Sequence, residues 1–136
     1  KRIERMSGLV GIAPAPDFTL NILNGLTFEQ KESLTLNGYF MDKSSYHSEL
    51  IQISSSFLEE SKRNYVLNKK INLKVPVRLI HGLKDHDVNW RQSLKLSNII
   101  NNTDIEINFI RDGTHRLSRN KDLELIVKII NNLCKH

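Results

Sequence analysis

The segment that decides the fold is residues 75–115, VPVRLIHGLKDHDVNWRQSLKLSNIINNTDIEINFIRDGTH. It contains an apolar run at about 75–81, which has the length and composition of a buried β-strand, and a second strand is predicted at about 104–110. Between them, residues from about 89 to 101 have apolar positions at helical spacing. A strand, a helix and a second strand in this order make a crossover unit, so we expect the two strands to be parallel neighbours.

Each of these strands runs into a polar loop, and the two loops carry a carboxylate and an imidazole, Asp85 and His115. The carboxyl ends of parallel strands meet at one edge of a sheet, where open α/β sheets bind their ligands. We therefore expect the two side chains to face each other. A carboxylate that bonds one imidazole nitrogen fixes the tautomer, and the other nitrogen can then deprotonate a hydroxyl nucleophile.

Two alternatives accompany this interpretation. Asp87 lies in the same loop as Asp85 and is a rival for the acid, and Asp85 could also simply close the turn. The nucleophile is missing: the sequence has no Gly-x-Ser-x-Gly, the motif that places a serine before the acid and the histidine in chain order. No such motif surrounds the serines that could be substitutes for the nucleophile, which are Ser7, Ser44, Ser45 and Ser118, so none of them is expected to take this role.

Three segments resemble the α/β-hydrolases, and within that family its acyl-thioesterases and acyl-glucuronide esterases. Residues 76–90, PVRLIHGLKDHDVNW, are similar to the seventh strand and acid loop, although Asn89 stands where the family commonly has proline. Residues 113–119 resemble the histidine loop, and residues 8–18 resemble the strand after the nucleophile helix. The resemblance covers nearly the whole chain but only the C-terminal half of the family's fold.

The resemblance implies a partial α/β-hydrolase fold with three parallel strands and a function as the C-terminal part of a serine hydrolase. It selects Asp85 as the triad acid, because the family's acid stands three residues before the valine, here Val88. His115 is then the triad histidine. The substrate would be a small acyl ester or thioester, cleaved only if an N-terminal half supplied the serine and the oxyanion hole, so we expect the chain to be inactive alone.

The chain is expected to form one partial domain over residues 1–136. A third strand is predicted at about 7–13, because this short apolar run suits a strand buried on both faces and is ended by prolines. Residues 17–70 read as a helical excursion, which the resemblance implies is a cap over the active site. Flanking helices would complete the fold.

Local signals predict the helices. Thr27 and Gln30 have capping-box spacing, and the helix that they begin should break at Gly38. A helix is expected over residues 46–68 and another over 120–136, and residues 1–6 read as the end of a further helix. The predicted buried stripe of the last helix consists of Leu123, Ile126, Val127, Ile129, Ile130 and Leu133.

Composition excludes several classes of protein. The 136 residues carry a net charge of +5, but the basic residues are scattered and no nucleic-acid motif occurs, so we expect no nucleic-acid partner. No long apolar run predicts a membrane span. The single cysteine, Cys134, cannot form a disulfide framework and suggests a cytoplasmic chain, in which it would be a small core residue.

The remaining histidines and the tryptophan have structural interpretations. We expect no cofactor and no metal, because the histidines lack close ligand spacing. His81 should end a buried strand and bond to nearby backbone, whereas His47 and His86 should be exposed. Trp90 should pack beside the acid loop, although the resemblance leaves open a place in an acyl pocket.

A half fold has a consequence for association. The strand at 7–13 would lie in the middle of a complete sheet, and an uncovered apolar strand edge invites pairing with another chain. We expect homo-oligomers or complementation by a separately encoded N-terminal half. The alternative function is a non-catalytic remnant or interaction module of a truncated or split hydrolase gene.

Overall fold

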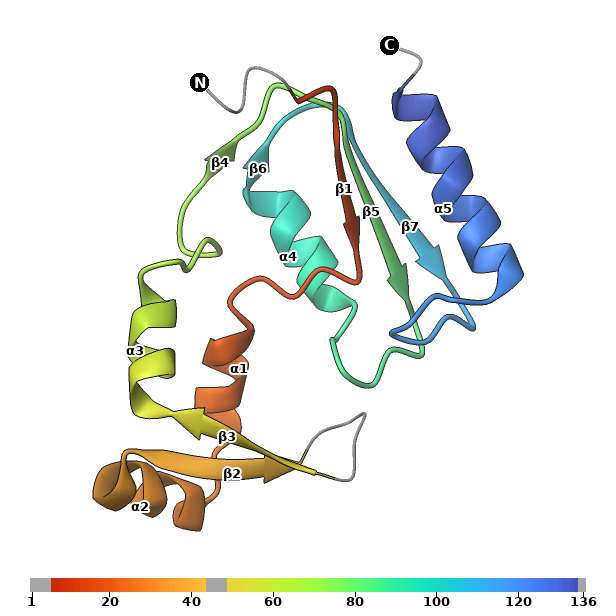
Figure 1. The fold of residues 1–136 in the computed structure, drawn as a ribbon. Coiled ribbons are helices and arrows are strands. Elements are labelled where there is room, and N and C mark those ends of the chain that lie inside the picture. Colours follow the sequence, from red (N-terminus) through yellow and green to blue (C-terminus); the bar gives the residue numbers. More distant parts are fainter. Residues whose placement is uncertain (1–5, 44–48, 135–136) are drawn as a thin grey trace. The chain divides into compact units, whose positions relative to one another are not determined.

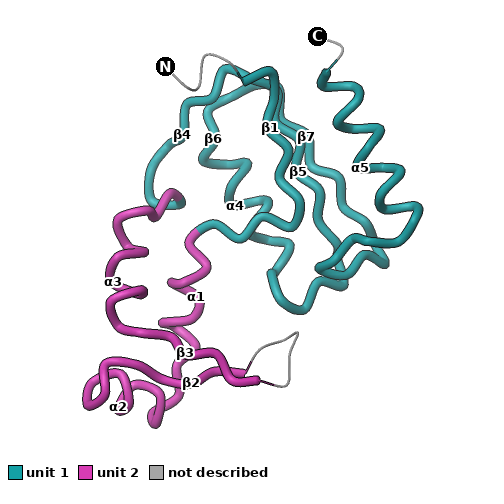
Figure 2. Tube along the Cα trace, in the orientation of Figure 1, with its two compact units in different colours: residues 1–16, 67–136 teal, residues 17–66 magenta. Residues whose placement is uncertain are grey.

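The computed structural model describes residues 6–43 and 49–134 of the chain. They form two compact units, one made of residues up to Pro16 and from Leu67 onward, and the other of residues Asp17–Val66 (Figure 2). Within the described residues, no helix is long and apolar enough to cross a membrane.

Unit 1 contains the predicted parallel sheet, in the order β1-β5-β7 (Figure 1). Ile80 of the central strand lies opposite Ile12 on one side and Asn108 on the other, and both pairings are parallel. The prediction of three parallel strands with flanking helices is therefore confirmed. The elements of unit 1 are β1 (Leu9–Ile12), β4 (Ile71–Asn72), β5 (Val77–Gly82), α4 (Arg91–Ile99), β6 (Ile100–Asn101), β7 (Ile105–Ile110) and α5 (Asn120–Leu133).

The central strand β5 has buried residues on both faces, and only Arg78 is half-buried, as expected for a mostly apolar strand in the middle of a parallel sheet. Val77 and Leu79 belong to a cluster with Ile100, next to the end of α4. Ile80 points to the opposite face and packs in a second cluster, which includes Ile126 of α5. This alternation follows from the two-residue period of a strand, and it holds one helix on each face of the sheet.

Unit 2 begins with α1 (Phe18–Gly25) and α2 (Phe28–Asn37). The predicted capping box is present: Thr27 accepts a hydrogen bond from the Gln30 N–H at 3.2 Å, and Gln30 accepts one from the Thr27 N–H at 3.0 Å. α2 breaks at Gly38, as predicted, and Gly38 has a left-handed backbone with φ 76°. An antiparallel pair, β2 (Tyr39–Lys43) and β3 (Leu50–Ser54), and the helix α3 (Ser55–Lys62) follow.

Among the described residues, the prediction of a helix over residues 46–68 is right only for Ser55–Lys62, which forms α3. Leu50–Ser54 forms β3, and α3 begins only after Ser54, which caps it by accepting a bond from the Phe57 N–H. The apolar residues Ile51 and Ile53 are β-branched and two positions apart, a pattern that suits a strand better than a helix. The prediction was wrong here because most apolar residues over the whole range 46–68 have helical spacing.

Two details of α5 also differ from prediction. Ile126, Ile129 and Leu133 are buried, but the other half of the predicted stripe is exposed: Leu123, Val127 and Ile130 are 47%, 54% and 40% exposed. The prediction that Cys134 is a core residue is wrong, because it is exposed at the end of α5. The predicted helix turn at residues 1–6 lies almost entirely outside the described residues.

Candidate active site

The acid loop and the histidine loop lie in direct backbone contact. The Leu83 N–H donates to the Ile110 carbonyl and the Lys84 N–H donates to the Gly113 carbonyl, each at 2.9 Å. The contact needs glycine at Gly82, because a Cβ there would overlap the carbonyl group of Gly113. The two loops are thus fixed against each other where their strands end.

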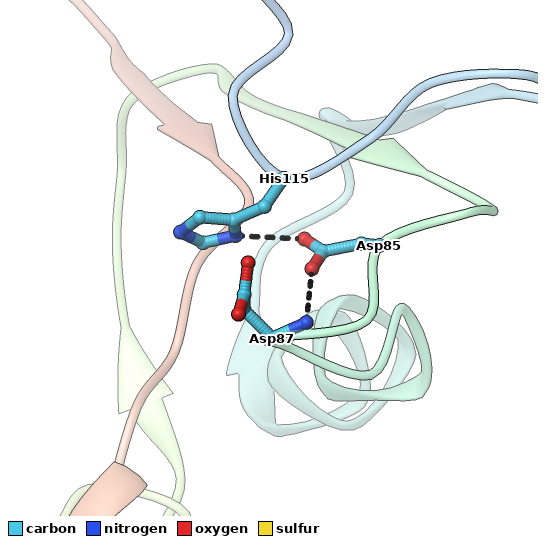
Figure 3. A group of neighbouring side chains, drawn as sticks. All are labelled: Asp85, Asp87 and His115. Atoms are coloured by element: carbon cyan, nitrogen blue, oxygen red, sulfur yellow. Dashed lines mark hydrogen bonds and ion pairs between the residues drawn. The ribbon is translucent and has the colours of Figure 1, made fainter. Parts of the chain in front are cut away.

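The side chain of Asp85 is completely buried at this junction. Its Oδ1 accepts hydrogen bonds from the backbone N–H groups of Asp87 at 2.9 Å and Val88 at 2.8 Å. Its Oδ2 lies 2.9 Å from Nδ1 of His115 (Figure 3). Burial raises the pKa of the Asp85 carboxyl, but the hydrogen bonds from Val88, His115 and Asp87 outweigh it, and the pKa lies below its ordinary value.

His115 is therefore oriented by an ionised carboxylate. Because a carboxylate only accepts, Nδ1 of His115 carries the proton of this bond, and proton transfer to or from a substrate would use the other ring nitrogen, Nε2. The side chain of His115 is 31% exposed, whereas that of Asp85 is buried. The structure thus brings together the two residues that the sequence singled out, with the geometry in which a carboxylate makes imidazole a general base.

The rival carboxylate, Asp87, is exposed and contributes its backbone N–H to Asp85. One ligand atom from each of Asp85, Asp87 and His115 lies within 4.8 Å of the others, so three donors for a metal ion are close together. The Asp85 oxygens, however, already accept two backbone N–H bonds and one from His115. A metal ion bound through Nδ1 of His115 would have to displace the proton of that last bond, whereas an acid–histidine pair uses all three bonds as they stand.

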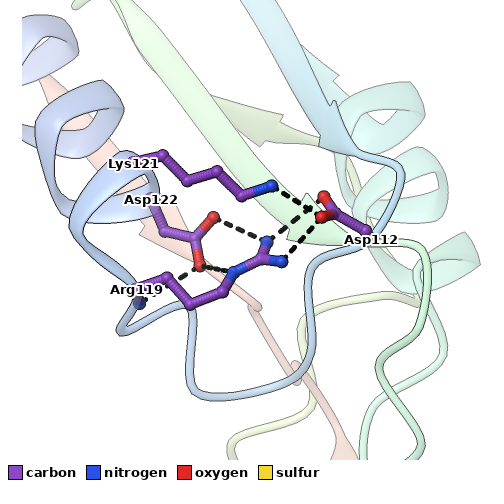
Figure 4. Close-up of polar contacts among 4 residues, drawn as sticks. All are labelled: Asp112, Arg119, Lys121 and Asp122. Carbon is purple, nitrogen blue, oxygen red and sulfur yellow. Dashed lines mark hydrogen bonds and ion pairs between the residues drawn. The ribbon is translucent and has the colours of Figure 1, made fainter.

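An ion-pair cluster closes the loop that carries His115 (Figure 4). Nε of Arg119 donates to Asp122 at 2.7 Å, and Nη1 donates to Asp112, on the other side of the loop, at 2.8 Å. Hydrogen bonds from Lys121 and Arg119 hold the pKa of the Asp112 carboxyl far below its ordinary value. The bond from Arg119 likewise lowers the pKa of Asp122, whose side chain is 2% exposed. One guanidinium thereby joins both ends of the histidine loop.

The same loop is anchored in the core by Leu117. This residue is 1% exposed and has a left-handed backbone, with φ 42°. A left-handed leucine is strained, so burial of its side chain has to hold it in place. Neither Leu117 nor the Arg119 cluster was identified as a positioning feature from the sequence; the Asp112–Arg119 spacing around His115 is the signal that could have suggested the latter.

The remaining histidines that the structure describes, and Trp90, lie around or away from this pair as follows. His81 is fully buried and bonds to the Val88 carbonyl, as predicted, and it also contacts Ser93, which the sequence did not suggest. Trp90 follows the acid loop and contacts the ring of Phe109 edge-on, with centroids 5.5 Å apart. His86 is exposed as predicted, and His47 lies outside the described residues.

Comparison with known proteins identifies similar chains. A scan of protein-family models finds no match. The palmitoyl-protein thioesterase ABHD10 of Bos taurus, a mitochondrial protein by its name, is 31% identical over 97% of this chain and 44% of its own length. A hydrolase structure from Agrobacterium vitis has a TM-score of 0.87 at 34% identity, covering 93% of this chain and 49% of that one. The structure of mouse ABHD10 has a TM-score of 0.83 at 30% identity, covering 94% and 52%.

These similarities and the parallel sheet define the class: the chain corresponds to the C-terminal part of an α/β-hydrolase, as the sequence predicted. Within this class, it is a homologue of the thioesterases named ABHD10. The chain spans less than half the length of the curated relatives that it matches. The expectation of a cytoplasmic location stays a prediction, since the names of those relatives place them in mitochondria.

Proposed function

We propose that this chain provides the acid, Asp85, and the histidine, His115, of a serine hydrolase that cleaves acyl esters or thioesters. The observation that carries the proposal is the 2.9 Å contact between Asp85 Oδ2 and His115 Nδ1. The names of the relatives favour a thioester with a long acyl chain as the substrate. The serine is proposed to come from residues outside these 136, because the sequence has no Gly-x-Ser-x-Gly.

The reaction follows from the pair. His115 Nε2 takes the proton of the serine hydroxyl as its oxygen attacks the acyl carbonyl, while Asp85 stabilises the imidazolium. Backbone amides from the rest of the fold would bind the oxyanion. His115 then gives its proton to the leaving thiol or alcohol. A water molecule, deprotonated by His115, hydrolyses the acyl-serine, and the carboxylic acid and the free serine result.

Reconstitution tests this function. The DNA upstream of the coding region is inspected for a segment that encodes Gly-x-Ser-x-Gly, in frame or as a separate chain. We expect the continuous polypeptide, or the mixture of the two chains, to hydrolyse a chromogenic acyl ester, whereas these 136 residues alone should not exceed background. Turnover that is absent from the completed protein, or that survives His115→Ala unchanged, would contradict the proposal.

A second candidate is a non-catalytic module that associates through its sheet edge. Among the described residues β1 pairs only with β5, and Ile12 on it is 45% exposed. We propose a second copy of the chain as the occupant of this edge. Covering about 600 Å² of apolar surface at roughly 25 cal/mol per Å² would give on the order of 15 kcal/mol before the costs of association.

Sedimentation velocity over a range of concentrations measures this association. We expect the 136-residue chain to form dimers or larger species as its concentration rises, because a free strand edge pairs readily. If a nucleophile-bearing segment exists, its addition should replace the homo-oligomer, since both would use the same edge. A strictly monomeric chain at all concentrations would contradict the second candidate and leave the first unaffected.

A further inference from the structure

His81 lies near the end of the central strand β5, just before the acid loop begins. The residue is fully buried, and both of its ring nitrogens have partners. Nδ1 lies 2.7 Å from the hydroxyl of Ser93, which is also fully buried, in the first turn of α4. Nε2 lies 3.0 Å from the carbonyl oxygen of Val88, at the end of the acid loop. The imidazole thus connects the strand, the loop and the helix.

These contacts fix the tautomer of His81. The Val88 carbonyl oxygen can only accept a hydrogen bond, so Nε2 of His81 carries a proton. The hydroxyl of Ser93 can donate to Nδ1. With its proton on Nε2, the His81 ring therefore makes both hydrogen bonds, one as acceptor at Nδ1 and one as donor at Nε2. The same Nε2 lies 3.2 Å from Oδ2 of Asp85, the oxygen that accepts the bond from His115.

We propose that His81 is a positioning residue for the catalytic acid, and that Ser93 acts through it by fixing the tautomer. The Nε2–H group of His81 ties the end of the acid loop to β5 and presents a positive dipole to the carboxylate of Asp85. This inference rests on the proposed function in naming Asp85 as the acid. The contacts themselves are independent of what the pair does.

A positioning role depends on the Nε2–H group of His81 as a hydrogen-bond donor, whereas a residue that only fills the core depends on its volume. The Oδ1 of Asp85 is held by amides of its own loop, Asp87 and Val88. Those bonds shape the loop but do not fix it to the sheet. Val88 is also the residue whose carbonyl His81 binds, so losing the Nε2 donor should release this end of the loop and displace the carboxylate from His115. A misplacement of about 1 Å can cost on the order of 100-fold in rate.

Two substitutions of His81 test the donor directly. The terminal amide of glutamine can reach the position of Nε2 and donate there, whereas asparagine is shorter and places its amide near Nδ1. In the completed hydrolase we expect His81→Gln to keep kcat within a few fold of the parent. His81→Asn should lower kcat by about 10- to 100-fold with KM little changed. Equal losses in the two variants would overturn the proposal.

Amide hydrogen exchange of the same completed protein provides a readout that does not need activity. His81→Asn should speed exchange of the Asp87 and Val88 amides, which donate to Asp85, while His81→Gln should keep them protected. If the protein hydrolyses no acyl substrate, the proposed function fails, yet this difference would still support the positioning role. Unchanged exchange of both amides in His81→Asn would overturn it.

Ser93→Ala supplies the second test if the variants of His81 do not fold. Ser97→Ala is the matched control, since it lies on the same helix but its hydroxyl donates to the Leu94 carbonyl. We expect Ser93→Ala to change the ¹⁵N shifts that report the tautomer of His81 and to lower kcat several fold, and Ser97→Ala to do neither. A His81 tautomer and a kcat that are unchanged in Ser93→Ala would overturn the role of Ser93.

Discussion

Gly82→Ala should destabilise unit 1 by about 3 kcal/mol or more, because overpacking against backbone cannot be relieved by a rotamer change. A Cβ at this position would overlap the carbonyl group of Gly113 and lie 2.9 Å from the carbonyl oxygen of Thr114. These atoms belong to the histidine loop, so the loop has to move away from the acid loop. The expected result is a lower denaturation midpoint in urea with an unchanged m-value.

Gly8→Ala is the matched control within the same unit. A Cβ at Gly8 meets side-chain atoms of Leu133 at 3.4 Å and the carbonyl oxygen of Pro76 at 3.5 Å, which are ordinary contacts. Its effect should stay within about 1 kcal/mol. If Gly82→Ala were as mild as Gly8→Ala, the close approach of the two loops would be wrong, and so would the argument that it positions His115.

The sequence predicted the parts of the fold that depend on local pattern and chain order. The apolar run that breaks at His81 and Gly82 indicated a buried strand, and the crossover to the next strand predicted the parallel arrangement that the structure has. Chain order alone therefore placed the acid loop and His115 at one edge of the sheet, and the family resemblance then selected Asp85 over Asp87. The pairing of Asp85 and His115 over thirty residues of separation follows from topology, with no information about side-chain packing.

Other features could not be predicted because they depend on what surrounds a residue. Val127 and Ile130 fit a buried helical stripe as well as Ile126 does, but α5 meets the sheet on only one side in the described structure. The hairpin β2–β3 was missed because its paired residues lie seven to fifteen positions apart in the chain, and the apolar spacing of the longer segment also fitted a helix. Arg119 belongs to the segment that resembles the histidine loop, yet the neighbouring sequence did not indicate that its guanidinium group would bind both Asp112 and Asp122.

Asp85→Asn should lower kcat of the completed hydrolase by on the order of 10³- to 10⁴-fold while leaving the fold intact. The two backbone N–H groups at Oδ1 require an acceptor, so the carbonyl oxygen of the asparagine should take that position. Its NH₂ group then faces Nδ1 of His115. Because an NH₂ group only donates, His115 would carry its proton on Nε2 and could no longer accept one from the serine.

Asp87→Asn separates the effect of the acid from that of a general loss of charge. It makes the same substitution two residues away, at an exposed side chain, and leaves the backbone N–H that donates to Asp85 in place. Its loss of kcat should be far smaller, and circular dichroism should show both variants folded. If Asp87→Asn were instead the inactive variant and Asp85→Asn retained turnover, then Asp87 would be the acid. The burial and hydrogen bonds of Asp85 would then serve only to shape the loop.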